Sequence, residues 1–159
     1  MKLEKKDTRF KQGVYIPKNK EKYKGRDYPR YLSSWELKFF RFCDIEPAIL
    51  EWSSEAIVIP YLSPIDNKVH NYITDAVIKM KTKEGVKRFL VEVKPYKQTL
   101  KPVMRLNKKT SKPCKSSIYE QLTFLRNQAK WDAAKKWCKK HDMEFTIITE
   151  HHLNIKKYI

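Results

Sequence analysis

Apolar and polar residues alternate over residues 88–94 as a half-buried β-strand requires. One face of this predicted strand carries Phe89, Val91 and Val93, and the other carries Leu90, Glu92 and Lys94. A carboxylate and an ammonium on a largely buried strand are costly unless they are paired or have a chemical role. We therefore expect Glu92 and Lys94 to belong to a functional site.

The residues before this strand predict a partner for it. A long strand is predicted over residues 68–80, and Lys83-Glu84-Gly85 predicts a reversal into residues 88–94. The two strands would form an antiparallel hairpin that places Asp75 close to Glu92. A further short strand is predicted over residues 56–59, ending at Pro60.

Helical periodicity predicts two helices. The first begins near Ser33 or Ser34, which are good N-caps, and runs through Cys43. The second covers residues 118–140, with Ser117 and Glu120 at the spacing of a capping box. Its predicted core stripe consists of Ile118, Leu122, Leu125, Ala129, Ala133 and Trp137.

A last strand is predicted over residues 144–149, which completes the order α-β-β-β-α-β. This order predicts one α/β domain in which helices flank a mixed sheet. We expect that domain to span residues 31–159.

Charge narrows the class of partner. The chain has 35 Lys and Arg against 18 Asp and Glu, a formal net charge of +17. Such an excess predicts a polyanionic partner, with phosphates neutralised by Lys and Arg. No apolar stretch approaches the ~20 residues of a membrane span. No predicted helix concentrates Lys and Arg opposite an apolar face, so we expect no membrane partner.

Two segments concentrate the basic residues. Residues 1–30 predict an extended arm, anchored by Tyr15, Ile16 and Tyr23, that either tracks DNA or is simply solvated. Residues 95–117 are interrupted by prolines and predict a basic loop beside the strand of Glu92. The predicted nucleic-acid-binding residues of this loop are Lys97, Gln98, Lys101, Arg105, Lys108 and Lys109.

The carboxylates suggest a specific chemistry. Asp75 and Glu92 would supply two oxygen ligands for a hard divalent cation, with Lys94 as a cation nearby, which is what metal-assisted phosphodiester hydrolysis needs. Glu36 has two interpretations. It is either a first-turn carboxylate favoured by the helix dipole or a third acid at the site.

These residues also carry a resemblance. Asp75 followed by Glu92-Val93-Lys94 on the next strand resembles the PD-(D/E)XK nuclease signature, and Glu36 fits the extra acid of that superfamily. Thr74 stands where the signature has its proline. Further segments resemble head-completion nucleases of tailed phages: residues 15–25, 31–36, 52–55, 59–61, 63–64 and 92–95. A more distant similarity, which includes residues 145–150, is to TnsA-like endonucleases.

The resemblance implies a restriction-endonuclease-like core and a DNA endonuclease that trims or nicks packaged DNA ends during head completion. It implies that Asp75, Glu92 and Glu36 bind Mg²⁺ or Mn²⁺, with the Val93 carbonyl as a further ligand, and that Lys94 orients or deprotonates the attacking water. The implied partners are double-stranded DNA, at ends or junctions, and phage head or portal proteins. The protein would act in the host cytoplasm during assembly and could be retained in the virion.

Two other functions stay open from the sequence. One is a non-catalytic DNA-binding virion protein that seals the head at the portal. The other is a junction-resolving or restriction enzyme of the same fold. The sequence makes no prediction of the oligomeric state.

Overall fold

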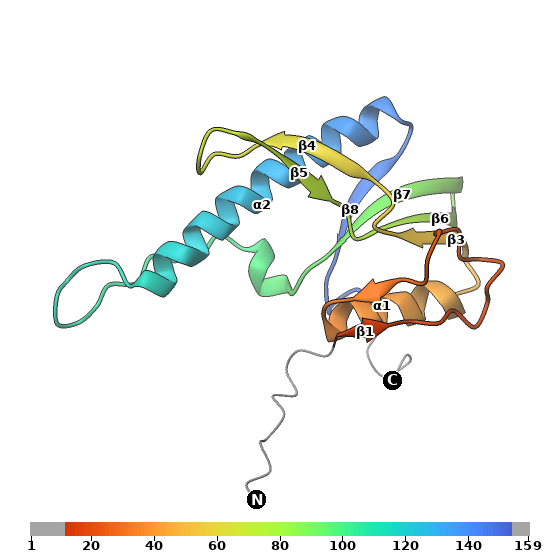
Figure 1. Cartoon of the computed structure of the whole chain (residues 1–159), viewed down its shortest axis with the longest axis horizontal. Coiled ribbons are helices and arrows are strands. Elements are labelled where there is room, and N and C mark those ends of the chain that lie inside the picture. The colour runs from red at the N-terminus through yellow and green to blue at the C-terminus, as the bar shows by residue number, and fades with distance from the viewer. Residues whose placement is uncertain (1–11, 154–159) are drawn as a thin grey trace, which may run out of the picture.

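A four-stranded sheet forms the centre of the computed structural model, which describes residues 12–153 (Figure 1). Its order is β3 (Ile49–Ser54), β6 (Ala76–Thr82), β7 (Gly85–Val93) and β8 (Glu144–Ile148). The first three strands are antiparallel neighbours, and β8 runs parallel to β7. With α1 (Ser34–Ile45) before β3 and α2 (Lys115–Lys140) before β8, the predicted α-β-β-β-α-β order and mixed sheet are confirmed. The first strand of that order is β3 and not the predicted residues 56–59, which lie outside this sheet.

Helix α1 covers one face of the sheet. Its Phe39, Phe40 and Cys43 are buried against residues of β3, β6 and β7, including Trp52 and Val91. The helix begins after Ser33, whose hydroxyl accepts a hydrogen bond from the Glu36 amide at 3.1 Å. The predicted N-cap is thereby confirmed.

Helix α2 and a separate hairpin cover the opposite face. The hairpin consists of β4 (Val58–Leu62) and β5 (Val69–Ile73). Tyr72 of this hairpin packs with Leu90 of β7 and with Ala134 and Cys138 of α2. Leu90 and Val91 thus point to opposite sides of β7, as their alternation predicts.

The predicted hairpin between residues 68–80 and 88–94 is present as β6 and β7. Gly85 closes its turn with φ of +116°, a conformation that strains residues with a Cβ. The single strand predicted over residues 68–80 is wrong, because the chain breaks at Thr74 and Asp75 into β5 and β6.

Thr74 explains this break. Its amide and its hydroxyl both donate to the Ile57 carbonyl, each at 3.1 Å, so the chain turns away from the hairpin before it enters the main sheet. A proline at this position would lack the amide donor. Two further strands differ from the prediction. Strand β4 continues through Pro60, and β3 has no counterpart among the predicted strands.

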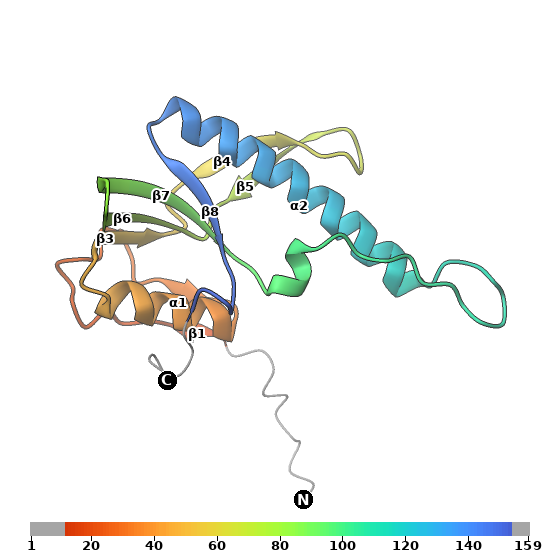
Figure 2. The same ribbon diagram turned by 180° about the vertical axis from the view of Figure 1, so that it is seen from behind.

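The beginning of α2 also differs from the prediction. Cys114 is the N-cap, and the Ser117 hydroxyl accepts a hydrogen bond from the Arg105 amide at 2.8 Å, so no capping box forms. The predicted stripe fails in the first half, where Ile118, Leu122 and Leu125 are exposed. Both views show the reason: these first turns extend beyond the sheet (Figures 1 and 2).

The second half of α2 packs on the sheet, and it includes the predicted stripe residues of that half, Ala129, Ala133 and Trp137. Trp131, Ala134 and Cys138 are buried, and Ala129, Ala133 and Trp137 pack around them. Neither α2 nor α1 has the apolar length that a membrane span requires, within residues 12–153.

Part of the predicted basic arm lies against the domain. Residues 1–11 lie outside the described residues, whereas β1 (Gly13–Val14) pairs with β2 (Arg30–Tyr31) close to α1. Tyr23 packs on Trp52 with ring centroids 4.6 Å apart. Tyr15 packs against the same core, but Ile16 is 61% exposed and does not serve as an anchor.

Asp44 of α1 holds residues 15–19 against the domain through hydrogen bonds. Its carboxylate is fully buried and accepts hydrogen bonds from the Tyr15 hydroxyl at 2.7 Å, the Lys18 amide at 2.7 Å and the Asn19 amide at 2.9 Å. Asp44 therefore satisfies backbone donors that would otherwise be buried without partners.

We expect Asp44→Ala to lower the free energy of unfolding by about 3 kcal/mol or more, because hydrogen bonds to a charged group contribute roughly 1.5–3 kcal/mol each. Urea denaturation followed by tryptophan fluorescence measures this change. Asp132→Ala is the matched control, since Asp132 is exposed on α2. Equal stability of the two variants would contradict the role of Asp44.

Candidate active site

The register of β6 and β7 brings Asp75 and Glu92 together. Ala76 pairs with Val91, so the residues beside them, Asp75 and Glu92, face each other across the two strands. One Asp75 oxygen, Oδ2, accepts a hydrogen bond from the Val93 amide at 2.7 Å. Asp75 thus lies at the end of the ladder, where its second oxygen is not used by that bond.

Glu92 is held on both oxygens. Its side chain is only 4% exposed, and Oε1 lies 2.9 Å from Lys94 Nζ. The other oxygen, Oε2, accepts a hydrogen bond from the buried Tyr72 hydroxyl. Burial and the Glu92 charge raise the pKa of Tyr72, so this phenol stays a hydrogen-bond donor.

The site combines two like charges, the carboxylates of Asp75 and Glu92, with one cation, the ammonium of Lys94. Burial and the Glu92 carboxylate raise the pKa of Asp75 to about 7, against the opposing effects of Lys94 and the Val93 amide. Burial alone would lower the pKa of Lys94, but the charges of Glu92 and Asp75 outweigh it and raise that pKa. Lys94 is therefore an ammonium at neutral pH.

Glu36 sits at the edge of this group. Its carboxylate accepts hydrogen bonds from the Leu32 amide at 2.8 Å and the Ser33 hydroxyl at 3.1 Å, so it helps to cap α1. Its charge also raises the pKa of both Asp75 and Lys94. Among residues 12–153, no three His, Cys, Asp or Glu side chains form a metal cluster. A metal-binding role for Glu36 stays a prediction.

Two residues near the site were not identified from the sequence. Tyr72 orients Glu92 from β5, and Lys130 of α2 lies 5.5 Å from the Tyr72 ring centroid. Burial lowers the pKa of Lys130, Glu92 opposes this shift, and Lys94 reinforces it, so Lys130 lies within electrostatic reach of the site. No local signal distinguishes Lys130 from its many neighbouring lysines, because only the packing of α2 on the hairpin places it here.

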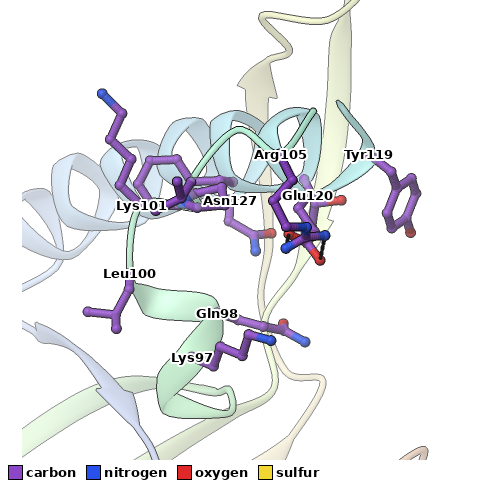
Figure 3. A pocket seen from close by; sticks show the side chains of 12 residues that line it. Lys97, Gln98, Leu100, Lys101, Arg105, Tyr119, Glu120 and Asn127 are labelled. Atoms are coloured by element: carbon purple, nitrogen blue, oxygen red, sulfur yellow. Dashed lines mark hydrogen bonds and ion pairs between the residues drawn. The ribbon is translucent and has the colours of Figure 1, made fainter. Parts of the chain in front are cut away.

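The predicted nucleic-acid-binding residues divide into two groups. Lys97 and Gln98, in the short 3-10 helix η1 (Tyr96–Thr99), line a pocket together with Lys101 and Arg105 (Figure 3). Lys108 and Lys109 lie in the exposed loop between Leu106 and Pro113, which form a β-bridge.

A divalent cation fits the chemistry of the central pair. Carboxylate oxygens are the ligands that Mg²⁺ and Mn²⁺ prefer. The repulsion from Glu92 that raises the pKa of Asp75 is relieved when a cation lies between the two carboxylates. Asp75 and Glu92 are therefore the residues of this site that would hold the metal.

We expect the affinity for Mn²⁺ to depend on pH, because the ion must displace the proton that Asp75 retains below pH 7. The association constant should rise about tenfold per pH unit between pH 5.5 and 7 and then level off. Isothermal titration calorimetry in buffers of different ionisation enthalpy measures both the affinity and the proton released. A pH-independent affinity without proton release would contradict the raised pKa.

Comparisons with known proteins identify the family of the chain. A sequence profile described as TnsA-like endonuclease N terminal matches residues 46–150, a range that contains Asp75, Glu92 and Lys94. The chain is also 37% identical over 139 residues to the head completion nuclease of Enterobacteria phage T4, which covers 87% of this chain and 90% of that protein. The predicted resemblance is thereby confirmed, and a nuclease role for the chain is supported. The chain belongs to the family of phage head-completion nucleases, and its residues 46–150 match a TnsA-like endonuclease domain.

Proposed function

We propose that this nuclease is a DNA endonuclease that depends on Mg²⁺ or Mn²⁺ and trims or nicks packaged DNA ends during head completion. The observation that carries the proposal is the pairing of the half-buried Asp75 with the buried Glu92 beside Lys94. A fold gains little from burying two carboxylates whose charges repel each other, and such costs are typical of functional sites.

The metal, held by Asp75 and Glu92, would polarise a phosphoryl oxygen and lower the pKa of a water molecule. Lys94 supplies positive charge at the same place, because its Nζ lies 2.9 Å from Glu92 Oε1. As an ammonium it orients the attacking water and stabilises the charge of the pentavalent phosphorane. A second cation that neutralises Glu92 would remove the main interaction that raises the pKa of Lys94. Burial would then lower that pKa, and a lower pKa favours action of Lys94 as a base.

Tyr72 and Lys130 complete the arrangement from the other layer. The Tyr72 hydroxyl fixes the rotamer of Glu92, so the carboxylate is oriented before substrate arrives. Lys130 lies 5.9 Å from the Tyr61 ring centroid as well as above Tyr72, so its ammonium is held on the site's side of α2. We assign Lys130 to a phosphate of the bound strand.

The substrate and the setting follow from charge and family. The net charge of +17 favours association with the DNA backbone, and double-stranded DNA ends or junctions are the substrates we propose. Phage head or portal proteins would bring the enzyme to those ends. We place this activity in the host cytoplasm during assembly, with retention in the virion as a further proposal.

The competing function is a non-catalytic DNA-binding protein that seals the head at the portal. The same net charge of +17 supports it, since it requires only DNA binding. It gives no reason for the half-buried Asp75 and Lys94 to be grouped around the buried Glu92, so we prefer the endonuclease.

We expect purified protein to convert supercoiled plasmid to nicked and linear forms with Mg²⁺ and not with EDTA. Glu92→Ala should abolish this activity through loss of a metal ligand, and Lys94→Ala should lower the rate about 10²–10⁴-fold, the usual contribution of a general acid or base. Agarose gels of timed samples measure the rates.

Glu51→Ala and Lys79→Ala are the matched controls, because these residues form a half-exposed ion pair, 3.6 Å apart, on β3 and β6 of the same sheet. Both controls should cut at the wild-type rate. Cleavage by Glu92→Ala, or cleavage by Lys94→Ala at the wild-type rate, would refute the mechanism. Salt-dependent DNA binding without cleavage under any divalent ion would favour the sealing protein.

A further inference from the structure

A pocket of about 470 Å³ lies between η1, the chain that follows it and the first half of α2 (Figure 3). Its volume is within the range of about 300–1,000 Å³ that small ligands occupy. Leu100, Val103 and Phe124 give it an apolar lining. None of the predicted or observed catalytic residues contributes to its wall, so the pocket is distinct from the carboxylate site.

One wall carries a polar group that lacks a partner. Asn127 is only 7% exposed, and no hydrogen bond joins its side-chain amide to another residue in the part of the chain that the structure describes. This side chain extends from α2 toward η1, into the space between them (Figure 3). The amide atoms are not among the fully buried polar atoms without a partner, so they reach solvent in the pocket. A ligand that offers both a donor and an acceptor can bond to them there.

The rim of the pocket is basic. Lys97 and Lys101 are exposed at its edge, and the structure gives neither of them an ion pair. Arg105 is instead held by Glu120 through two contacts of 3.0 Å, which fixes the chain at one side of the pocket. Exposed ammonium groups around an apolar pocket suit a ligand with a flat apolar body and a phosphate.

The pocket is connected to the active site along two elements. Asn127 precedes Lys130 on α2 by three residues, about 4.5 Å along the helix axis at the usual rise per residue. Residues at this spacing lie on one helix face. Lys97 follows Lys94 by three residues at the end of β7. A ligand in the pocket would therefore lie next to a phosphate bound at Asp75, Glu92 and Lys94.

We propose that this pocket holds one unpaired nucleotide of the DNA substrate, with the base against Phe124 and the Asn127 amide and its phosphate at Lys97 or Lys101. A base within a duplex is stacked and paired and enters such a pocket only if it is extruded. The enzyme would thus prefer DNA whose scissile phosphate lies beside a single-stranded nucleotide, as at an overhang, a flap or a frayed end. This inference rests on the proposed function and specifies its substrate.

Binding of matched DNA hairpins tests the pocket. All hairpins have the same duplex and a single-stranded tail of four nucleotides. The tail is on the 3′ end in one pair and on the 5′ end in the other, and each pair has one natural and one abasic tail. Both tails have the same phosphates, so the ratio of their dissociation constants reports the bases alone. Fluorescence anisotropy in EDTA at moderate salt measures this ratio without cleavage.

We expect wild-type protein to bind one of the natural tails at least about fivefold more tightly than its abasic counterpart, the lower limit for stacking of a single base. Asn127→Ala should lower this ratio to about 2 or less, because a base has lost its hydrogen-bonding partner. Gln128→Ala is the matched control, since it removes an amide one residue away on α2 that does not line the pocket, and it should keep the wild-type ratio.

Leu100→Trp provides a second variant if Asn127→Ala melts well below wild type, because Leu100 is half exposed at the rim and a larger side chain there fills the pocket. Its ratio should fall in the same way.

Equal binding of natural and abasic tails by wild type would overturn the proposal. A wild-type ratio in both pocket variants would also overturn it. In either case an acidic protein segment would be the better occupant of the pocket. Failure of the endonuclease proposal appears separately, as absence of plasmid cleavage by a protein that still distinguishes the two tails.

Discussion

Burial of the Glu92 carboxylate is the constraint on which the rest of the structure depends. Glu92 lies on a central strand with apolar layers on both faces, where an unpaired charge would be prohibitive. Lys94 satisfies one oxygen and the Tyr72 hydroxyl satisfies the other. The β4–β5 hairpin, which is an addition to the core order of the fold, is therefore also the element that orients the Glu92 carboxylate of the proposed metal site.

Asp75 adds a second carboxylate beside Glu92. The arrangement that suits the proposed cation binding therefore opposes the stability of the fold. The chain break at Thr74 positions Asp75 at the end of the β6–β7 ladder, where burial and Glu92 raise its pKa. This arrangement costs stability without a cation, and the divalent cation that we propose would recover that cost as binding energy by neutralising the pair. Two large apolar layers stabilise the fold against this cost. Asp44 adds to that stability because its hydrogen bonds hold residues 15–19 against α1.

The sequence predicts elements well where a local rule decides them. The alternation around Glu92, the Ser33 cap and the turn at Gly85 each depend on neighbouring residues, and each is present in the structure. The break at Thr74 was missed because it depends on a carbonyl at Ile57, seventeen residues earlier in the chain. The exposed start of α2 was missed because periodicity identifies an apolar face but not how far the sheet beneath it extends. Tyr72, Lys130 and Asn127 become recognisable only once the hairpin, α2 and η1 lie together.

The most direct test of the central claim is a crystal structure of the protein with Mg²⁺, with Mn²⁺ substituted to identify the ion by its anomalous scattering. We expect one ion bound by oxygens of both Asp75 and Glu92, at about 2.0–2.1 Å for Mg²⁺, with Lys94 close to a water molecule of its shell. An ion bound elsewhere, with Asp75 still paired only to the Val93 amide and Glu92 only to Lys94 and Tyr72, would contradict a metal-dependent nuclease site at these residues.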